Sequence, residues 1–246
     1  MDHASSPALG SGLPRPWSAS LGGSRLRVVP WQGDRHTALV GPARASRPPT
    51  SHDLAACLDR LEARGVRAAV TPALSPADAR PFEAAGFGLR ERLHLLSFDL
   101  SLDIPEPRHA LVAGRPWHRR SVLRIDRAAF EDFWQFDTAS LSEARRATPA
   151  HRYRVAVESR RPVGYAVTGR AGHRGYLQRL AVDPARFGEG IGSSLVHDCL
   201  LWLRRRRAAV AMVNTQERNE RALDLYRRLG FESEPMGLVV LEWSTS

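Results

Sequence analysis

The sequence predicts an α/β (α+β) protein with a mixed central sheet flanked by helices. Short apolar runs alternate with amphipathic, helix-like segments along most of the 246 residues, and glycine or proline separates many of them. A hydrophobic content of 43% with 25% charged residues is ordinary for a globular protein and excludes disorder throughout. This length leaves room for one large domain or two small ones.

The first part of the chain is expected to hold a tail, a structured half and a linker. Residues 1–24 are rich in Ser, Gly and Pro without periodicity, so we expect a disordered tail. Residues 25–100 form the first structured half, and residues 101–108, with Pro105 and Pro107, form the linker. The expected strands of this half cover 26–29, 37–40, 66–71 and 92–100, and the expected helices cover 53–64 and 76–85.

Residues 109–246 form the second structured half, which ends in a hairpin-like pair of strands. Its longest expected helix carries Ile191, Leu195, Cys199 and Leu203 at intervals of four residues on one face. The expected helices cover 119–130, 141–146, 190–207 and 219–229, and the expected strands begin near Ala110 and cover 153–158, 163–169, 176–182, 209–214 and 238–243.

The two halves share a degenerate repeat. Leu39-Val-Gly-Pro-Ala-Arg44 resembles Ala181-Val-Asp-Pro-Ala-Arg186, and Phe82-Glu-Ala-Ala-Gly-Phe87 resembles Tyr226-Arg-Arg-Leu-Gly-Phe231. The order of helix, strand and helix between these segments is the same in both halves. Chance similarity is the alternative.

Two motifs in the second half carry chemistry. In Leu180-Ala-Val-Asp-Pro-Ala-Arg-Phe-Gly-Glu-Gly-Ile-Gly-Ser193, three glycines between a strand and a helix can present successive N–H groups at the positive end of the helix, an arrangement that binds phosphate. The motif is neither a GxGxxG fingerprint nor a P-loop, and a tight turn without a ligand is the alternative. The second motif, Asn219-Glu-Arg-Ala-Leu-Asp-Leu-Tyr-Arg-Arg-Leu-Gly-Phe231, places Ala222, Leu225 and Tyr226 on one side of a helix.

With these two motifs, residues 109–244 resemble the GNAT superfamily of acetyl-CoA-dependent N-acetyltransferases, in particular the bacterial ribosomal-protein-alanine N-acetyltransferases. The resemblance implies that the strand at 176–182 splays from its neighbour, and that Tyr226 protonates the departing thiolate as general acid. The implied acetyl-CoA-binding residues are Leu180, Ala181 and Val182 for the pantetheine arm and the thioester carbonyl, Gly188, Glu189, Gly190, Ile191, Gly192 and Ser193 for the pyrophosphate, and Asn219.

Two positions depart from the family pattern. Phe187 stands where the family has Gln or Arg, so that either Arg186 reaches the phosphates or backbone amides alone hold them. Asn214 stands where the alanine N-acetyltransferases have a Glu, and an amide cannot take a proton. We therefore expect proton removal through water or capture of a neutral amine, which favours α-amines with a pKa near 8 over lysine side chains near 10.4.

An aromatic and acidic segment is expected to border the acceptor. Phe133, Trp134 and Phe136 lie among Glu131, Asp132, Asp137 and Glu143, and such a rim suits a cationic amine. The alternative is that the aromatic side chains pack the core and the acidic ones face solvent.

The first half is expected to be a catalytically silent GNAT-like remnant. Its glycine turn is replaced by Ala45-Ser-Arg-Pro-Pro-Thr-Ser51, in which Pro48 and Pro49 lack N–H groups, and Phe82 replaces the tyrosine. This tandem plan is similar to that of mycothiol synthase.

All 36 basic residues are arginine, and the net charge is +10. Either an anionic partner or a compositional bias explains the absence of lysine, and we favour the bias. Separately, a polyanionic cofactor would explain local positive charge near Arg179, Arg186 and Arg218. Cys57 and Cys199 are not at metal spacing and are expected to be buried thiols. We expect no metal, no membrane partner and no nucleic acid, and a cytoplasmic location.

The sequence thus predicts transfer of an acetyl group from acetyl-CoA to a primary amine, either a peptide N-terminus or a small amine. One alternative is a small-molecule acetyltransferase of the mycothiol-synthase type. Another is a non-catalytic acyl-CoA-binding or RNA-associated module with Arg204–Arg207 as its contact patch.

Overall fold

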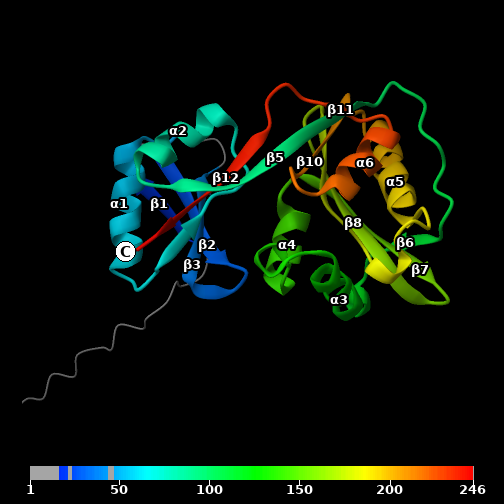
Figure 1. Cartoon of the computed structure of the whole chain (residues 1–246), viewed down its shortest axis with the longest axis horizontal. Coiled ribbons are helices and arrows are strands. Elements are labelled where there is room, and N and C mark those ends of the chain that lie inside the picture. Colours follow the sequence, from blue (N-terminus) through cyan, green and yellow to red (C-terminus); the bar gives the residue numbers. More distant parts are fainter. Residues whose placement is uncertain (1–16, 22–23, 44–46, 246) are drawn as a thin grey trace, which may run out of the picture. The chain divides into compact units, whose positions relative to one another are not determined.

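The computed structural model describes residues 17–21, 24–43 and 47–245 (Figure 1). Residues 1–16 of the expected tail lie outside the described residues. Trp17–Leu21, also assigned to the tail, instead forms strand β1, which pairs with Ser24–Val28. The alternation of Trp17, Ala19 and Leu21 with serine is the two-residue period of a strand, and the Ser and Gly content of the region obscures it.

The chain forms two compact units, and their limits differ from the expected ones. Unit 1 takes the chain up to Arg92 and then the last residues from Leu238, whereas unit 2 takes Leu93–Gly237. The expected division at 101–108 is therefore wrong. Most of the strand before this segment belongs to unit 2, and the last strand of the chain belongs to unit 1. Most of β5 (Gly88–Asp99) pairs within unit 2, and β12 (Leu238–Ser244) pairs within unit 1.

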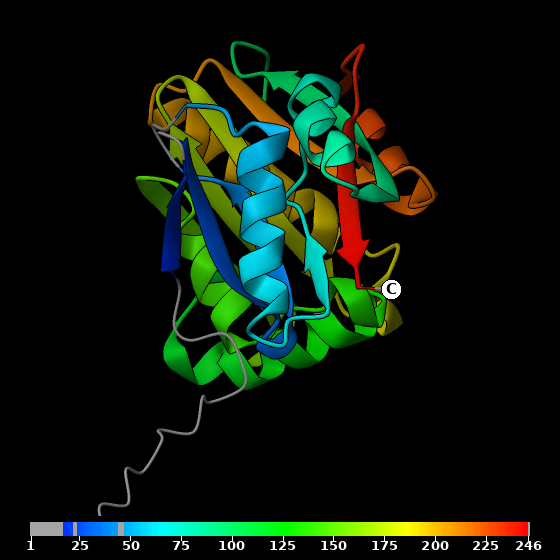
Figure 2. The ribbon, with the colours of Figure 1, turned by 90° about the vertical axis from the view of Figure 1, so that its left-hand side faces the viewer.

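Unit 1 is a five-stranded mixed sheet in the order β1-β2-β3-β4-β12. Among its described strands, β3 and β4 are parallel, and the other neighbours are antiparallel. Both helices pack on the sheet through one hydrophobic core, and Figure 2 shows α1 in front of the strands. Besides β1 and β12, the elements are β2 (Ser24–Trp31), β3 (Asp34–Pro42), α1 (Ser51–Glu62), β4 (Ala68–Val70) and α2 (Pro76–Ala84).

Local signals explain where these helices begin. Thr50 accepts a hydrogen bond from Asp53 N (3.2 Å), and the Asp53 carboxylate accepts one from Thr50 N (3.0 Å), which is a capping box. Ser75 caps α2 in the same way through Asp78 N (3.2 Å), and Pro76 occupies its first position.

The described sheet of unit 2 has seven strands: six follow the order β5-β10-β9-β8-β7-β6, and β11 pairs with β5 beside this path. The expected terminal hairpin is absent from the described residues, because β11 pairs with β5 and β12 pairs with β4. The remaining elements are β6 (Leu111–Ala113), η1 (Pro116–His118), α3 (Arg119–Ala129), η2 (Asp132–Trp134), α4 (Thr138–Arg146), β7 (Ala150–Glu158), β8 (Arg161–Ala171), β9 (Arg174–Val182), η3 (Pro184–Arg186), α5 (Ile191–Arg205), β10 (Val210–Gln216), α6 (Glu220–Arg228) and β11 (Glu232–Ser233).

Helices cover both faces of this sheet. α3 and α4 pack on one face through a cluster that includes Ile125, Leu141 and Tyr165. On the other face, α5 and α6 enclose a second cluster that includes Leu195 and Tyr226. Figure 1 shows α3 and α4 on the opposite side of the strands from α5 and α6.

The same arrangement of elements recurs within each unit, as the degenerate repeat predicts. In both, a helix connects two parallel strands and a second helix follows: α1 and α2 in unit 1, α5 and α6 in unit 2. α2 and α6 each end at a glycine with positive φ, 93° at Gly86 and 89° at Gly230. Phe82 holds the place of Tyr226, since Phe87 N donates to Phe82 O (3.1 Å) as Phe231 N does to Tyr226 O (3.0 Å). Of the replaced glycine turn, Ala45 and Ser46 lie outside the described residues.

Both cysteines are free and buried, as expected. Burial raises the pKa of Cys57 to about 11 and that of Cys199 to about 12, so both remain thiols at neutral pH. In the part of the chain that the structure describes, no helix combines the length and the apolar character needed to cross a membrane.

Candidate functional site

An opening between β9 and β10 forms the centre of the candidate site. The two strands pair only at their first three residues, Arg174–Tyr176 with Val210–Met212. Beyond this point β10 continues along β5, while β9 continues along β8 after a register shift near Thr168. The edge of β9 from Leu177 to Val182 that faces β10 therefore has no strand partner, which is the splay that the resemblance implies.

The turn after β9 leaves the start of α5 open to a ligand. Gly188 (φ 85°) and Gly190 (φ 84°) are both left-handed, a conformation that glycine adopts without steric cost. Gly190 is the N-cap of the 15-residue helix α5, and no side chain caps it. The N–H groups of the first turn are thus free to bind an anion at the positive end of the helix.

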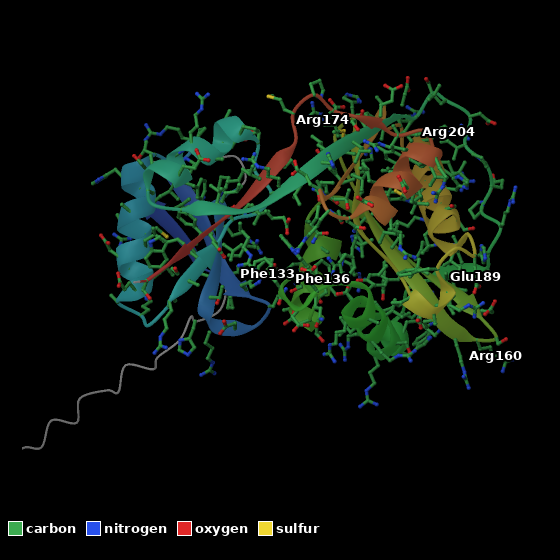
Figure 3. The ribbon with its side chains drawn as sticks, in the orientation of Figure 1. Phe133, Phe136, Arg160, Arg174, Glu189 and Arg204 are labelled. Carbon is green, nitrogen blue, oxygen red and sulfur yellow. The ribbon has the colours of Figure 1, made fainter. Side chains whose placement is uncertain are left out.

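A pocket of about 690 Å³ runs along this turn and the unpaired edge. Glu189 is the one expected cofactor-binding residue that does not line it. Its carboxylate accepts instead from Arg186 Nε (2.8 Å) and Arg186 Nη2 (2.7 Å). Figure 3 shows Glu189 before the start of α5 and Arg204 toward its other end. The expected residues that do line the pocket are Leu180, Ala181, Val182, Gly188, Gly190, Ile191, Gly192, Ser193 and Asn219.

The cations around the larger pocket differ from those expected. Arg186 lines it but forms ion pairs with Glu189 and Glu158. Two arginines on α6 that the sequence reasoning missed, Arg221 and Arg228, also line it, and the Arg221 guanidinium lies 4.1 Å from the centre of the Phe187 ring. The sequence contains a pattern that could have identified them, because a seven-residue spacing places both arginines on one side of a helix.

A second pocket of about 160 Å³ lies in the opening between β9 and β10 and shares Phe130, Leu180, Asn219 and Ala222 with the larger one. It brings together Asn214, on β10, and Tyr226, on α6. Its other lining residues are Leu93, Trp134, Leu177, Gln178, Arg179, Val213, Thr215 and Gln216. Among the described residues, no three or more His, Cys, Asp or Glu side chains are grouped in a way that could hold a metal.

Tyr226 is held as a neutral phenol. Its side chain is 5% exposed. Burial raises its pKa above the usual value near 10; Cys199 adds to this rise, and Arg179 opposes it. The hydroxyl therefore remains a proton donor at neutral pH.

The aromatic and acidic segment is placed differently from the expectation. Of its aromatic residues, only Trp134 lines a pocket; Phe133 packs edge-on against Trp134, and Phe136 packs on the guanidinium of Arg179. The acidic residues line neither pocket. Asp137 caps α4 through Ser140 N (2.7 Å), and Glu131 pairs with Arg218.

Residues 119–231, which carry both pockets, match the model of the acetyltransferase (GNAT) family. This part of the chain is a GNAT acetyltransferase domain. Members of the GNAT family transfer an acyl group to an amine. No curated protein matches the chain.

Solved structures share the fold of the GNAT domain and of the whole chain. A tandem GNAT protein from the clavulanic acid biosynthesis pathway is 17% identical, with a TM-score of 0.67 over 93% of this chain and 82% of its own. A GCN5-related N-acetyltransferase from Kribbella flavida is 15% identical, with a TM-score of 0.61 over 94% of this chain and 91% of its own. Another GCN5-related N-acetyltransferase, from Sphaerobacter thermophilus, is 16% identical, with a TM-score of 0.58 over 90% of this chain and 76% of its own. The two-part arrangement thus recurs in a tandem GNAT protein.

Proposed function

We propose that the GNAT domain transfers an acetyl group from acetyl-CoA to a primary amine by direct attack. The observation that carries this proposal is the meeting of the two pockets where β9 leaves β10. One pocket is large enough for an extended donor. The other is small and contains a buried tyrosine.

The larger pocket fits the chemistry of the donor. Leu180, Val182 and Leu225 give it an apolar wall for a pantetheine arm. The uncapped first turn of α5 supplies N–H groups for a pyrophosphate, and Arg221 and Arg228 supply positive charge that Phe187 does not. Acetyl-CoA bound here would supply an acetyl carbon activated as a thioester.

Three tasks then fall to the protein: to polarise the thioester carbonyl, to accept a neutral amine and to protonate the sulfur. Backbone N–H groups on the unpaired edge near Leu180–Val182 polarise the carbonyl. Tyr226 donates its proton to the departing thiolate. Asn214 cannot act as a base, so an amine that arrives protonated loses this proton to water, or the amine arrives neutral, which favours α-amines. After the attack the nitrogen loses one further proton to water, and Tyr226 is protonated again from solvent.

Donor binding and acceptor use can be measured separately. Saturating acetyl-CoA should raise the melting temperature, because a ligand at 100 times its Kd stabilises a protein by about 2.7 kcal/mol. Thiol release should follow on addition of an amine from a panel of peptide N-termini, free amines and aminosugars. Stabilisation without turnover of any amine would favour an acyl-CoA-binding module, and stabilisation by RNA alone would favour an RNA-associated one.

A matched pair of variants locates the donor. Arg221→Gln should weaken acetyl-CoA binding by roughly 10-fold, since a charge-assisted hydrogen bond contributes about 1.5–3 kcal/mol. Arg205→Gln removes an equal charge from an exposed arginine in the last turn of α5 and should leave binding unchanged. Equal binding by both variants would contradict the placement of the phosphates at α6.

A further inference from the structure

Arg179 on β9 is held by two aromatic rings: Phe136, from the segment expected to border the acceptor, and Phe130, at the end of α3. Its guanidinium carbon lies 3.4 Å from the centre of the Phe130 ring and 3.9 Å from that of Phe136. Aromatic faces attract cations at this distance. The cation that these rings bind is therefore a side chain of the protein itself.

A buried carboxylate fixes the orientation of this guanidinium. Arg179 Nε donates to Asp126 Oδ2 (2.8 Å), and Nη2 donates to Asp126 Oδ1 (2.8 Å) and to Trp134 O (2.7 Å). Asp126 is fully buried and also accepts from Phe136 N (2.6 Å) and from the Tyr165 hydroxyl. The ion pair thus places Arg179 rigidly and neutralises its charge locally.

One amino group of Arg179 is left over. A guanidinium has five N–H groups, and the contacts above use three of them. The two N–H groups on Nη1 have no acceptor among residues 17–21, 24–43 and 47–245. The side chain is 10% exposed, and Arg179 lines the smaller pocket.

The lining of the smaller pocket selects against a cationic acceptor. It contains no Asp or Glu among the described residues, and Arg179 is its only permanently charged residue. A protonated amine would find no counter-charge there, whereas an oxygen acceptor would find the spare donors of Nη1. Asn214 and Gln216, on β10, are further polar groups in the same lining.

We propose that the acceptor is an amine with a carboxylate or amide carbonyl oxygen beside it, as in an α-amino acid or a peptide N-terminus, and that Arg179 Nη1 binds this oxygen. The inference rests on the proposed function and makes Arg179 a specificity-determining residue. A simple alkylamine lacks the oxygen and is a poorer acceptor.

Three small amines test the preference: alanine carries a carboxylate, alaninamide a carbonyl and isopropylamine neither. With rates expressed per neutral amine, kcat/KM for alanine or alaninamide should exceed that for isopropylamine by roughly 10-fold or more. Alanine and alaninamide together distinguish the carboxylate from the carbonyl. A ratio near one for both would overturn the inference.

The variant Asp126→Asn with Arg179→Met removes the donor without leaving a buried charge unpaired. It should reduce the ratio to about one, mainly by raising KM for the oxygen-bearing amines. Arg152→Met with Asp198→Asn is the matched control, because it removes another bidentate pair (2.7 and 2.8 Å) that lines neither pocket, and the ratio should remain. An equal loss for all three amines in the Arg179 variant would mean a structural role or a contact with the thioester, and would overturn the inference.

Measuring how amines bind, without turnover, distinguishes a failure of this inference from a failure of the proposed function. Thermal shifts with CoA present compare alaninamide and isopropylamine without turnover. If acetyl-CoA binds and no amine is acetylated, the proposed function fails, but preferential binding of alaninamide still supports the role of Arg179. Equal binding of the two ligands overturns the role of Arg179 alone.

Discussion

Tyr226 and Tyr153 are two buried tyrosines of unit 2 with different surroundings. Tyr226 lines the smaller pocket, whereas Tyr153 lines neither pocket and its hydroxyl has no hydrogen-bond partner in the described structure. Burial raises the pKa of both, to about 12 in Tyr153. Only Tyr226 is thus placed to give a proton to a bound molecule.

Tyr226→Phe should lower the rate of transfer by about 10²–10⁴-fold, the usual contribution of a general acid. The raised pKa means that the wild-type hydroxyl stays protonated beyond about pH 10, the ordinary pKa of a tyrosine. The wild-type rate should therefore rise with pH as the amine loses its proton, with no alkaline fall up to about pH 10, and the variant should show the same rise at a much lower rate. A pH profile of kcat measures both effects.

Tyr153→Phe is the control and should keep the wild-type profile. Acetyl-CoA should stabilise both variants, which separates chemistry from binding. If Tyr226→Phe retained the wild-type rate, Tyr226 would not be the acid, and a pH profile that changed with Asn214→Ala would point to Asn214 instead.

Some residues of the site belong to short continuous sequence motifs, whereas others depend on partners that are distant in the chain. Gly188, Gly190, Asn219 and Tyr226 belong to continuous motifs, so that the sequence is sufficient to find them. The role of Arg179 depends on Asp126, 53 positions away in the chain, and on which face of β9 meets α3. Pairings of this kind follow from packing, and no pattern in the sequence predicted them.

At the scale of elements, the turn into α5 depends on the left-handed Gly190. Gly190→Ala should cost roughly 1–2 kcal/mol of stability, because a Cβ disfavours this backbone conformation. The relaxed turn would also move the first N–H groups of α5, so acetyl-CoA binding should weaken. Melting temperature with and without acetyl-CoA measures both quantities.

Gly172, in the hairpin between β8 and β9, provides the comparison. It also has positive φ (59°), and an added Cβ would have no atom within 4 Å. Gly172→Ala should therefore lose comparable stability while its response to acetyl-CoA stays that of the wild type. The same reduced response in both variants would mean that backbone strain alone, rather than the turn, governs binding.

Most elements could be predicted because each has a local signal. Capping residues and apolar periodicity place the helices within a few residues of their observed limits, as in α1, where Thr50 and Asp53 form the capping box. β1 was missed because Ser and Gly surround a short alternation. The partner of β12 could not be predicted, because its apolar residues suit the edge of either sheet.

At the scale of the whole molecule, β12 completes the sheet and core of unit 1. Leu241 is fully buried in that core, so Leu241→Ala should cost about 2–5 kcal/mol. Hydrogen exchange should then rise in β3 and β4 of unit 1, while acetyl-CoA still protects α5 and α6 of unit 2. An equal rise in α5 would show that the two units unfold as one.

The place of β12 in unit 1 also bears on how the chain folds during synthesis. Domains generally fold as units, N-terminal first, as they leave the ribosome. Here one of the two strand partners of β4 comes from residues 238–244, which are made after all of unit 2. Unit 2 can therefore assemble its sheet first. The sheet of unit 1, although made earlier, keeps one edge of β4 unpaired until β12 has been synthesised.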